Sequence, residues 1–234
     1  MDDTLIHTRK LSWFHASDFI SRKGMTIQEM REATCKWNEW MREEAAKMPV
    51  GEGRYAAVLA REVSKLGWTV LTFDDGGYAV MPRPHASDFL SLAGAIAPVT
   101  VITTAARDYA SKVFSDILGR PDLCKGMIAR DTIFPGGGYM SKPGWEWMGK
   151  PKFVIVDDSS ETSEPLINKL TYLGLPVGEE RMSGWCLKEG CQQTVRKHHV
   201  LVSRYNPHEN RDDNTLLEST IGEVKAKLAS LSVR

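Results

Sequence analysis

The apolar residues between positions 9 and 67 recur at the three- and four-residue spacing of amphipathic helices. Thr26 and Glu29 have the spacing of a capping box at the start of one helix, and Pro49 and Gly51 mark its end. A second apolar stripe stops at Gly67, a typical residue after a helix end. We therefore expect residues 9–67 to be helical. The expected inner faces are Ile27, Met30, Trp37 and Met41 in the first helix, and Tyr55, Val58, Val63 and Leu66 in the second.

After residue 67 the pattern changes to short apolar runs separated by amphipathic segments. Two β-rich runs around Asp75-Gly76 predict a hairpin at 68–81. The runs at 99–103, 153–156 and 200–202 predict strands, and the segments at 86–96, 107–118 and 214–230 predict helices. The run "FVIV" lacks alternation, as is typical of a parallel strand buried on both faces. Strands that alternate with helices predict an α/β domain with a largely parallel sheet.

Composition and charge exclude several classes of protein. The length of 234 residues suits one domain with an insertion, and 42% hydrophobic residues are enough for a core. Lys and Arg number 30 and Asp and Glu also number 30, which argues against a protein that binds nucleic acid by bulk charge. No apolar run is long enough to span a bilayer, and no secretory signal is visible. We therefore expect an intracellular protein, cytoplasmic or nuclear, without a nucleic-acid or membrane partner.

The cysteines also favour a reducing compartment, because they are few and scattered. They are Cys35, Cys124, Cys186 and Cys191. Cys186 and Cys191 with the downstream His198 and His199 could suggest zinc, but the spacing of the two cysteines is loose for zinc ligands. Two thiols in a loop, followed by two histidines that enter a strand, are the favoured interpretation.

Polar residues follow the apolar runs at the points where strands are expected to end. Thr103 and Thr104 follow "VI", and Asp157 and Asp158 follow "FVIV". The segment "DDTL" would have the same position if a strand preceded it. Ligands of open α/β sheets bind at the carboxyl ends of the strands. Carboxylates there can hold Mg²⁺, and hydroxyl and ammonium groups can hold phosphoryl oxygens, so the pattern indicates phosphoryl transfer.

Several motifs, in order along the chain, resemble those of one phosphatase family. "MDDTLIH" matches the pattern DxD[DE]TL from its second position, and "RPHASDFL" at 83–90 is similar to "RPG…FL". "VITTAARDYA" is similar to the family strand that ends in Thr-Ala, and "VIVDDSS" to V-I-D-[DN]-S-P, with Ser160 in place of the proline. The chain thus resembles a haloacid dehalogenase superfamily phosphatase, in the branch of RNA polymerase II carboxy-terminal-domain phosphatases, also called NLI-interacting-factor-like.

The resemblance implies a haloacid-dehalogenase-like Rossmannoid parallel sheet with a helical insertion after motif one. The phosphatase core would comprise residues 1–8 and 68–234, and the insertion, a candidate cap, residues 9–67. The family reaction passes through an aspartyl-phosphate on the first Asp of motif one. That nucleophile would stand just before Met1, so we expect the chain to be truncated there, although a true loss of the nucleophile is the alternative.

The resemblance also assigns the remaining site residues. Asp2 would be the general acid and base, with its backbone carbonyl on the metal. Thr103 would hold the phosphoryl group, with Thr104 as the near alternative and with help from Lys142 and Thr4. The Mg²⁺ ligands would be Asp2, Asp157 and Asp158.

Simpler interpretations of these residues remain open. Asp157-Asp158 could cap a helix, Thr103 could be an ordinary strand residue, and Lys142 a surface lysine. The motifs favour a phosphoserine or phosphothreonine protein as substrate, whereas the long insertion favours a small phosphate ester.

Two further classes of function stay open. The same cleft could bind a phosphorylated ligand or a protein without turnover. Alternatively, the helical insertion could act through a partner surface of Trp13, Trp37 and Trp40. The sequence does not determine the oligomeric state.

Overall fold

The structure is a computed structural model that describes residues 4–21, 23–51, 53–73, 76–103, 105–133, 154–158 and 199–232. The chain divides into two compact units. One consists of His7–Met81, and the other of Met1–Ile6 with Pro82–Arg234. The expected bounds of the phosphatase core and the insertion stay a prediction.

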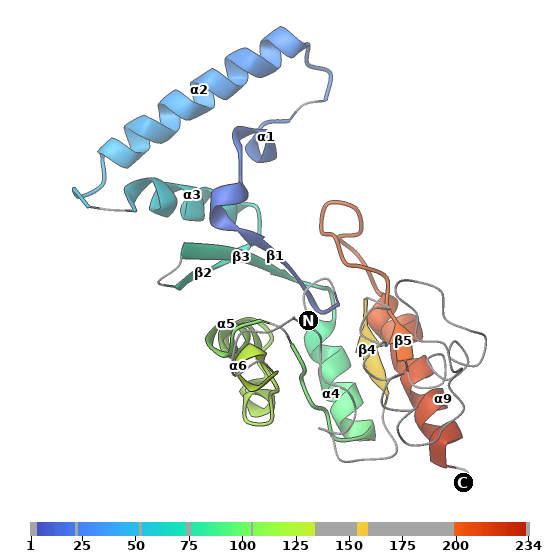
Figure 1. Ribbon diagram of the computed structural model, residues 1–234. Helices are drawn as coiled ribbons and strands as arrows, with labels where there is room; N and C mark the ends of the chain where they lie inside the picture. Colours follow the sequence, from blue (N-terminus) through green and yellow to red (C-terminus); the bar gives the residue numbers. More distant parts are fainter. Residues whose placement is uncertain are drawn as a thin grey trace, which may run out of the picture. The chain divides into compact units, whose positions relative to one another are not determined.

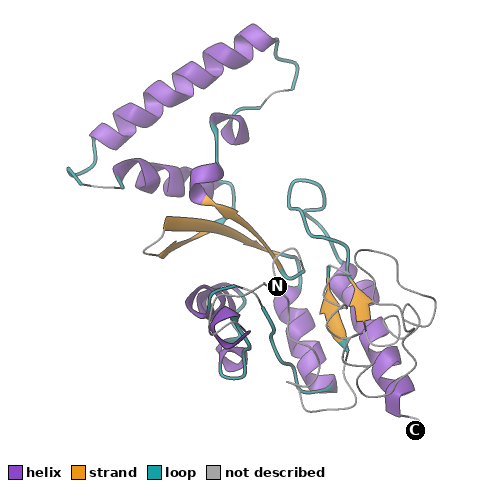
Figure 2. Cartoon of the chain, in the orientation of Figure 1, coloured by secondary structure: helices purple, strands orange, loops and turns teal. Residues whose placement is uncertain are grey.

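The unit His7–Met81 combines helices with a three-stranded sheet in the order β1-β3-β2 (Figures 1 and 2). Its strands are β1 (Ile6–Lys10), β2 (Thr69–Phe73) and β3 (Gly76–Pro82). Its helices are a 3₁₀ turn at Leu11–Trp13, α1 (Ala16–Phe19), α2 (Ile27–Ala46) and α3 (Arg54–Lys65). Strands β2 and β3 pair antiparallel, with Thr69 opposite Val80 and Phe73 opposite Gly76. The predicted hairpin is therefore confirmed.

Strand β1 corrects the expectation that residues 9–67 are helical from their start. Its five residues "IHTRK" include the fully buried Ile6, and the strand joins the sheet beside β3. The ring of His7 also meets the edge of Trp68 at a centroid distance of 5.7 Å. These partners lie far along the chain, so the local hydropathy pattern did not contain the signal that forms the strand.

The capping box of α2 is confirmed by its hydrogen bonds. The Glu29 amide donates to Thr26 Oγ1 at 3.3 Å, and the Thr26 amide donates to Glu29 Oε2 at 2.8 Å. The expected inner face is only partly correct, because Met41 is buried whereas Ile27 is 68% exposed. The core of the helix pair forms around Met41, Ala45 and Val58, at the carboxyl-terminal half of α2, so the first turn of α2 lies outside it.

A second apolar core joins α3 to the sheet. Its buried members are Leu11, Phe14, Val63, Trp68, Ala79 and Met81. Leu11 packs directly on the backbone of β3, because a Cβ at Gly77 would lie 3.1 Å from Leu11 Cδ2. A side chain at position 77 would therefore force this core apart.

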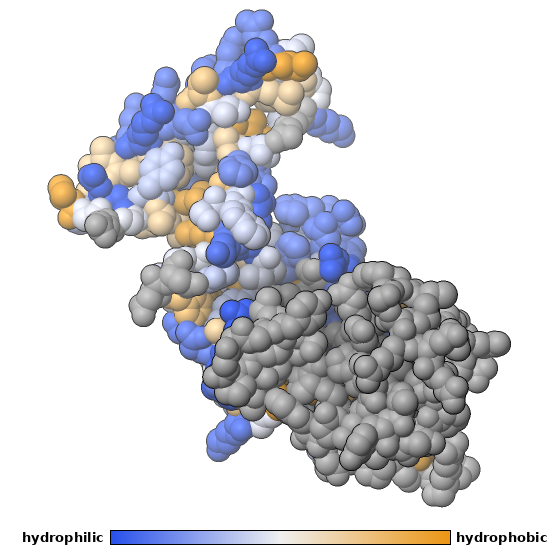
Figure 3. Space-filling view, in the orientation of Figure 1, coloured by the Kyte–Doolittle hydropathy of each residue, from blue (hydrophilic) through white to orange (hydrophobic). Residues whose placement is uncertain are grey.

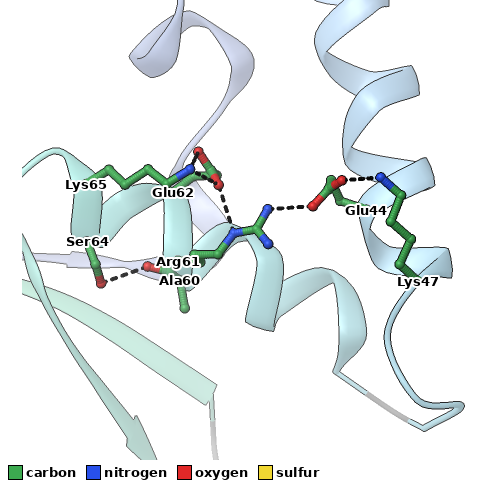
Figure 4. A network of polar contacts seen from close by, with 7 residues as sticks. All are labelled: Glu44, Lys47, Ala60, Arg61, Glu62, Ser64 and Lys65. Carbon is green, nitrogen blue, oxygen red and sulfur yellow. Dashed lines mark hydrogen bonds and ion pairs between the residues drawn. The ribbon is translucent and has the colours of Figure 1, made fainter.

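A network of charged side chains connects α2 and α3 (Figure 4). Arg61 of α3 donates from Nη2 to Glu44 of α2 at 2.8 Å, and from Nε to the neighbouring Glu62 at 3.0 Å. Lys47 Nζ contacts Glu44 at 2.5 Å, and Lys65 Nζ contacts Glu62 at 2.8 Å. The network braces the two helices at the level of their apolar core.

The other unit contains mainly helices and a short parallel sheet. Its helices are α4 (Ala86–Ile96), α5 (Arg107–Lys112), a 3₁₀ turn at Pro121–Cys124, α6 (Arg130–Ile133) and α9 (Ile221–Ser232). Wide π-helical turns at Val113–Ile117 and Leu216–Thr220 follow α5 and precede α9. Helix α4 packs against α9 (Figure 1). The predicted helices at 86–96, 107–118 and 214–230 therefore exist, the last two with a π-helical turn.

Strands β4 (Ile155–Asp157) and β5 (His199–Leu201) pair in parallel, with Ile155 opposite His199. The strand expected at 99–103 is reduced to a parallel bridge between Ile102 and Ile128. The mixture of helix and sheet is consistent with the predicted α/β class, although the parallel sheet has only two strands in the described residues. Within those same residues, no helix has the length and apolarity to cross a membrane.

Candidate functional site

Thr4 and Asp158 bring the first and the last predicted motifs together. The Thr4 hydroxyl donates to Asp158 Oδ1 at 2.7 Å and accepts from the Asp158 amide at 3.2 Å. Thr4 is 3% exposed. Two residues 154 positions apart in the sequence are thus held together by two hydrogen bonds.

The short parallel sheet places Asp158 at this point. Asp157 is the last residue of β4, and its backbone carbonyl accepts from the Val202 amide at 2.9 Å. Asp158 follows directly, at the carboxyl end of the strand, where ligands of α/β sheets bind. Asp158 is the member of the pair that contacts Thr4, and Asp157 is 4% exposed.

Arg204 is a cation at this site that sequence reasoning did not find. Its Nε lies 3.5 Å from Asp158 Oδ2, and its side chain is 71% exposed. An arginine so exposed forms only a weak ion pair and can turn toward another anion. It stands in the segment "VSRYN" after β5, where the sequence carries no signal beyond its place after a strand.

Thr103 lies at the end of the segment that bridges to Ile128. Its amide donates to the Ile128 carbonyl at 2.9 Å, and its hydroxyl accepts from the Ala105 amide at 3.1 Å. The side chain is 3% exposed. The structure therefore places Thr103 at the carboxyl end of a parallel pairing, and its role in the site stays a prediction.

Arg83 is a second residue near Thr4 whose contacts the sequence analysis did not predict. The motif "RPHASDFL" marked its position, but not its buried ion pair with Asp213 or its hydrogen bond to the Thr4 carbonyl. The signal that the sequence offered was a charged residue inside a short motif. Its partner, however, lies too far along the chain to be recognised.

The remaining predicted site residues lie outside the described residues. They are Asp2, Thr104 and Lys142. The same holds for Cys186, Cys191 and His198 of the zinc alternative, whereas His199 is a buried residue of β5. The described part of the chain contains no group of three His, Cys, Asp or Glu side chains that could hold a metal ion.

The donors at this site nevertheless fit a hard divalent cation. The carboxylates of Asp157 and Asp158 offer oxygen ligands, and Mg²⁺ is bound in proteins through one or two carboxylates together with water and phosphate oxygens. An oxygen-only set of this kind suits neither zinc nor a soft metal. The structure thus places two adjacent carboxylates at the carboxyl end of a parallel strand.

Comparison with protein families found one match. Residues 57–169 match the model of the NLI interacting factor-like phosphatase family. The match confirms the resemblance to this branch of the haloacid dehalogenase superfamily, and it includes Arg83, Thr103, Asp157 and Asp158. A search of curated proteins found no match to the chain.

Proposed function

We propose that the protein is a Mg²⁺-dependent phosphomonoester hydrolase that acts through an aspartyl-phosphate, on a haloacid-dehalogenase-like Rossmannoid core. The observation that carries the proposal is the pair of hydrogen bonds between Thr4 and Asp158. They join two of the motifs that the sequence analysis expects at the same edge of the sheet, and this juxtaposition supports the proposal. The family match supports the same activity.

In this proposal each residue of the motifs has a separate role in the reaction. The nucleophilic carboxylate belongs to an aspartate just before Met1 in the motif pattern, and Asp2 protonates the leaving oxygen and then deprotonates the attacking water. Thr103 and Lys142 hold the phosphoryl oxygens, and Thr4 or Thr104 assists. The Thr103 hydroxyl accepts from the Ala105 amide, which aims its own hydrogen away from that amide and makes it a donor for a phosphoryl oxygen.

Asp157, Asp158 and the backbone carbonyl of Asp2 would hold Mg²⁺. When bound, the ion neutralises charge that develops on the phosphoryl oxygens. Thr4 holds the Asp158 carboxylate through Oδ1, and Oδ2 lies 3.5 Å from Arg204 Nε. Groups that orient a metal ligand typically contribute about 10–100-fold in metal affinity or activity.

The proposed substrate is a phosphoserine or phosphothreonine in a protein. The family match supports it, whereas a small phosphate ester is the alternative that the insertion raises. The unit His7–Met81 has two apolar cores of its own, so it could form a folded cap. A panel of phosphopeptides and small esters separates the two, because a capped site selects the small esters.

The test of the proposed function measures phosphate release by the chain extended upstream through the motif-one aspartate. Release should require Mg²⁺ and should disappear in chelator. Asp158→Ala should lower it by at least about 100-fold, because a metal ligand is lost. Asp116→Ala is the matched control, since Asp116 is an exposed aspartate of the same unit that accepts a hydrogen bond from the Ser115 hydroxyl.

Two results would contradict the proposal. If Asp158→Ala retains full activity, the site is assigned wrongly. If the extended chain binds Mg²⁺ or phosphopeptide in a calorimetric titration but never releases phosphate, the protein is the non-catalytic binding module instead.

A further inference from the structure

Arg83 is the largest side chain in the described residues that is fully buried, and it is a charged one. It is 1% exposed, and its Nη2 lies 2.6 Å from Asp213 Oδ2, in an ion pair whose side chains are 0% and 4% exposed. Burying two charges costs several kcal/mol, so such a pair is weak evidence for stability by itself. A well-packed apolar pair would serve a purely structural purpose at lower cost.

The fork of Arg83 connects separate segments of the chain. Nη1 donates to the Thr4 carbonyl at 3.1 Å and to the Ser203 carbonyl at 2.9 Å. Nη2 donates to Ser203 Oγ at 3.1 Å in addition to Asp213. The Arg83 amide donates to the Leu5 carbonyl at 2.9 Å. One residue thus holds the motif-one backbone against the segment that follows β5.

Asp213 holds the guanidinium in place from the other side. Its Oδ1 accepts from the Thr215 amide at 2.8 Å, and its Oδ2 accepts from Asn210 Nδ2 at 3.1 Å. Burial alone would raise the pKa of Asp213, but the hydrogen bonds from Thr215 and the charge of Arg83 outweigh it and lower that pKa. The Tyr205 ring lies 5.8 Å from Arg83 Cζ and covers the cation.

We infer that Arg83, clamped by Asp213, is a positioning residue that acts through Thr4 on the carboxylate of Asp158. Arg83 holds the Thr4 carbonyl, and the Thr4 hydroxyl holds both Oδ1 and the amide of Asp158. The hydrogen bonds therefore form one continuous path, from the turn before α9 to the proposed metal ligand. The inference rests on the proposed function only where Asp158 is called a metal ligand.

Arg83→Lys keeps the charge and removes the planar guanidinium group. An ammonium is a compact point donor and cannot reach several acceptors in a fixed plane. We expect amide hydrogen exchange at Asp158, followed by NMR in the full chain, to become about tenfold faster, because its acceptor on Thr4 is displaced. Asp213→Asn is a milder second variant and should act in the same direction. Val113→Ala is the stability control, since Val113 is fully buried in the same unit.

A double-mutant cycle with Thr4→Val tests the path itself. In the Thr4→Val background the acceptor of the Asp158 amide is already gone, so Arg83→Lys should produce no further acceleration. Two results overturn the inference: exchange at Asp158 that is no faster in Arg83→Lys than in Val113→Ala, or effects that add fully in the double variant.

The kinetics of the extended chain provide the second readout. Arg83→Lys should lower kcat and leave KM unchanged, because substrate contacts remain while the metal ligand moves. The extended chain could show no phosphatase activity while exchange at Asp158 is still faster in Arg83→Lys and no faster again in the double variant. The proposed function would then fail and the positioning path would stand. If the chain is active and both exchange and kcat are unaffected by Arg83→Lys, the inference fails and the proposed function stands.

Discussion

At the scale of single residues, the site is organised by polar groups that lie far apart in the sequence. Thr4 supplies both a donor and an acceptor to Asp158, so one hydroxyl satisfies two polar groups of a buried turn. Arg204 approaches the other carboxylate oxygen from the solvent side. The carboxylate of Asp158 therefore has one oxygen held by Thr4 and one oxygen near an exposed cation.

Removing Arg204 should strengthen Mg²⁺ binding. The guanidinium and the metal compete for Asp158 Oδ2, and an exposed pair of this kind contributes only about 0–1 kcal/mol, so Arg204→Ala should lower the Kd for Mg²⁺ by no more than about fivefold. Calorimetric titration of the full chain measures the change. Arg211→Ala, an exposed arginine of the same segment, is the control and should leave the Kd unchanged. Weaker binding in Arg204→Ala would show that Arg204 belongs to the metal site.

Glycine should suit the backbone conformation of position 85 better than other residues do. It precedes α4 with φ at 59°, in the left-handed region that glycine adopts without strain, which explains why the family pattern has glycine after Arg-Pro. His85→Gly should exceed His85→Ala in free energy of unfolding by about 1 kcal/mol. Ala226→Gly in α9 is the reference and should destabilise by about 1 kcal/mol, because helix interiors disfavour glycine. Chemical denaturation measures all three, and a His85→Ala variant more stable than His85→Gly contradicts the explanation.

At the scale of elements, helices α2 and α3 pair through an apolar core and through the charged network of Arg61 and its neighbours. Figure 3 shows hydrophilic residues over much of the visible face of α2, with hydrophobic ones near its two ends. Ile27 at the start of α2 and Val50 beyond its end are exposed apolar residues, at 68% and 94%. Trp37 instead stacks on Phe19 at a centroid distance of 4.5 Å and also contacts Trp40. The tryptophans of α2 therefore serve internal packing, and Trp13, at 58% exposed, is the exposed member of the proposed partner surface.

The charged network makes the stability of the helix pair sensitive to acid. The hydrogen bond from Lys47, followed by that from Arg61, lowers the pKa of Glu44 from 4.5 to about 2. Because the folded pKa is depressed, the contribution of Glu44 to stability is complete above pH 4.5 and is lost as the pH falls toward 2. Glu44→Gln should therefore flatten the fall of the melting temperature across this window.

Thermal unfolding at a series of pH values measures this effect, and Glu43→Gln is the matched control on the same helix. Added salt should reduce the difference between wild type and Glu44→Gln, since exposed pairs are screened. If the melting temperatures of wild type and Glu44→Gln fall in parallel with pH, the charged network contributes nothing to stability.

At the scale of the whole molecule, the sequence predicted elements well wherever the signal was local. The Thr26–Glu29 capping box, the hairpin of β2 and β3 and helix α4 depend on residues within one or two turns of each other. Strand β1 and the ion pair of Arg83 with Asp213 were missed, because they depend on partners that only the folded chain brings close. The sequence placed the segments of Thr4 and Asp158 at the same edge of the sheet through the family motifs, but the hydrogen bond between the two residues was not predicted.

The two compact units should unfold separately, because each has its own apolar core. Met41 lies in the core of His7–Met81, and Phe114, 0% exposed, lies in the other unit. Met41→Ala should destabilise only the first unit by about 2–5 kcal/mol, and Phe114→Ala only the second by about 3–5 kcal/mol. Calorimetry should then show two transitions, each shifted by one substitution alone. A single transition that both substitutions shift together would mean that the units form one cooperative body, and the insertion could then not act as an independently folded cap.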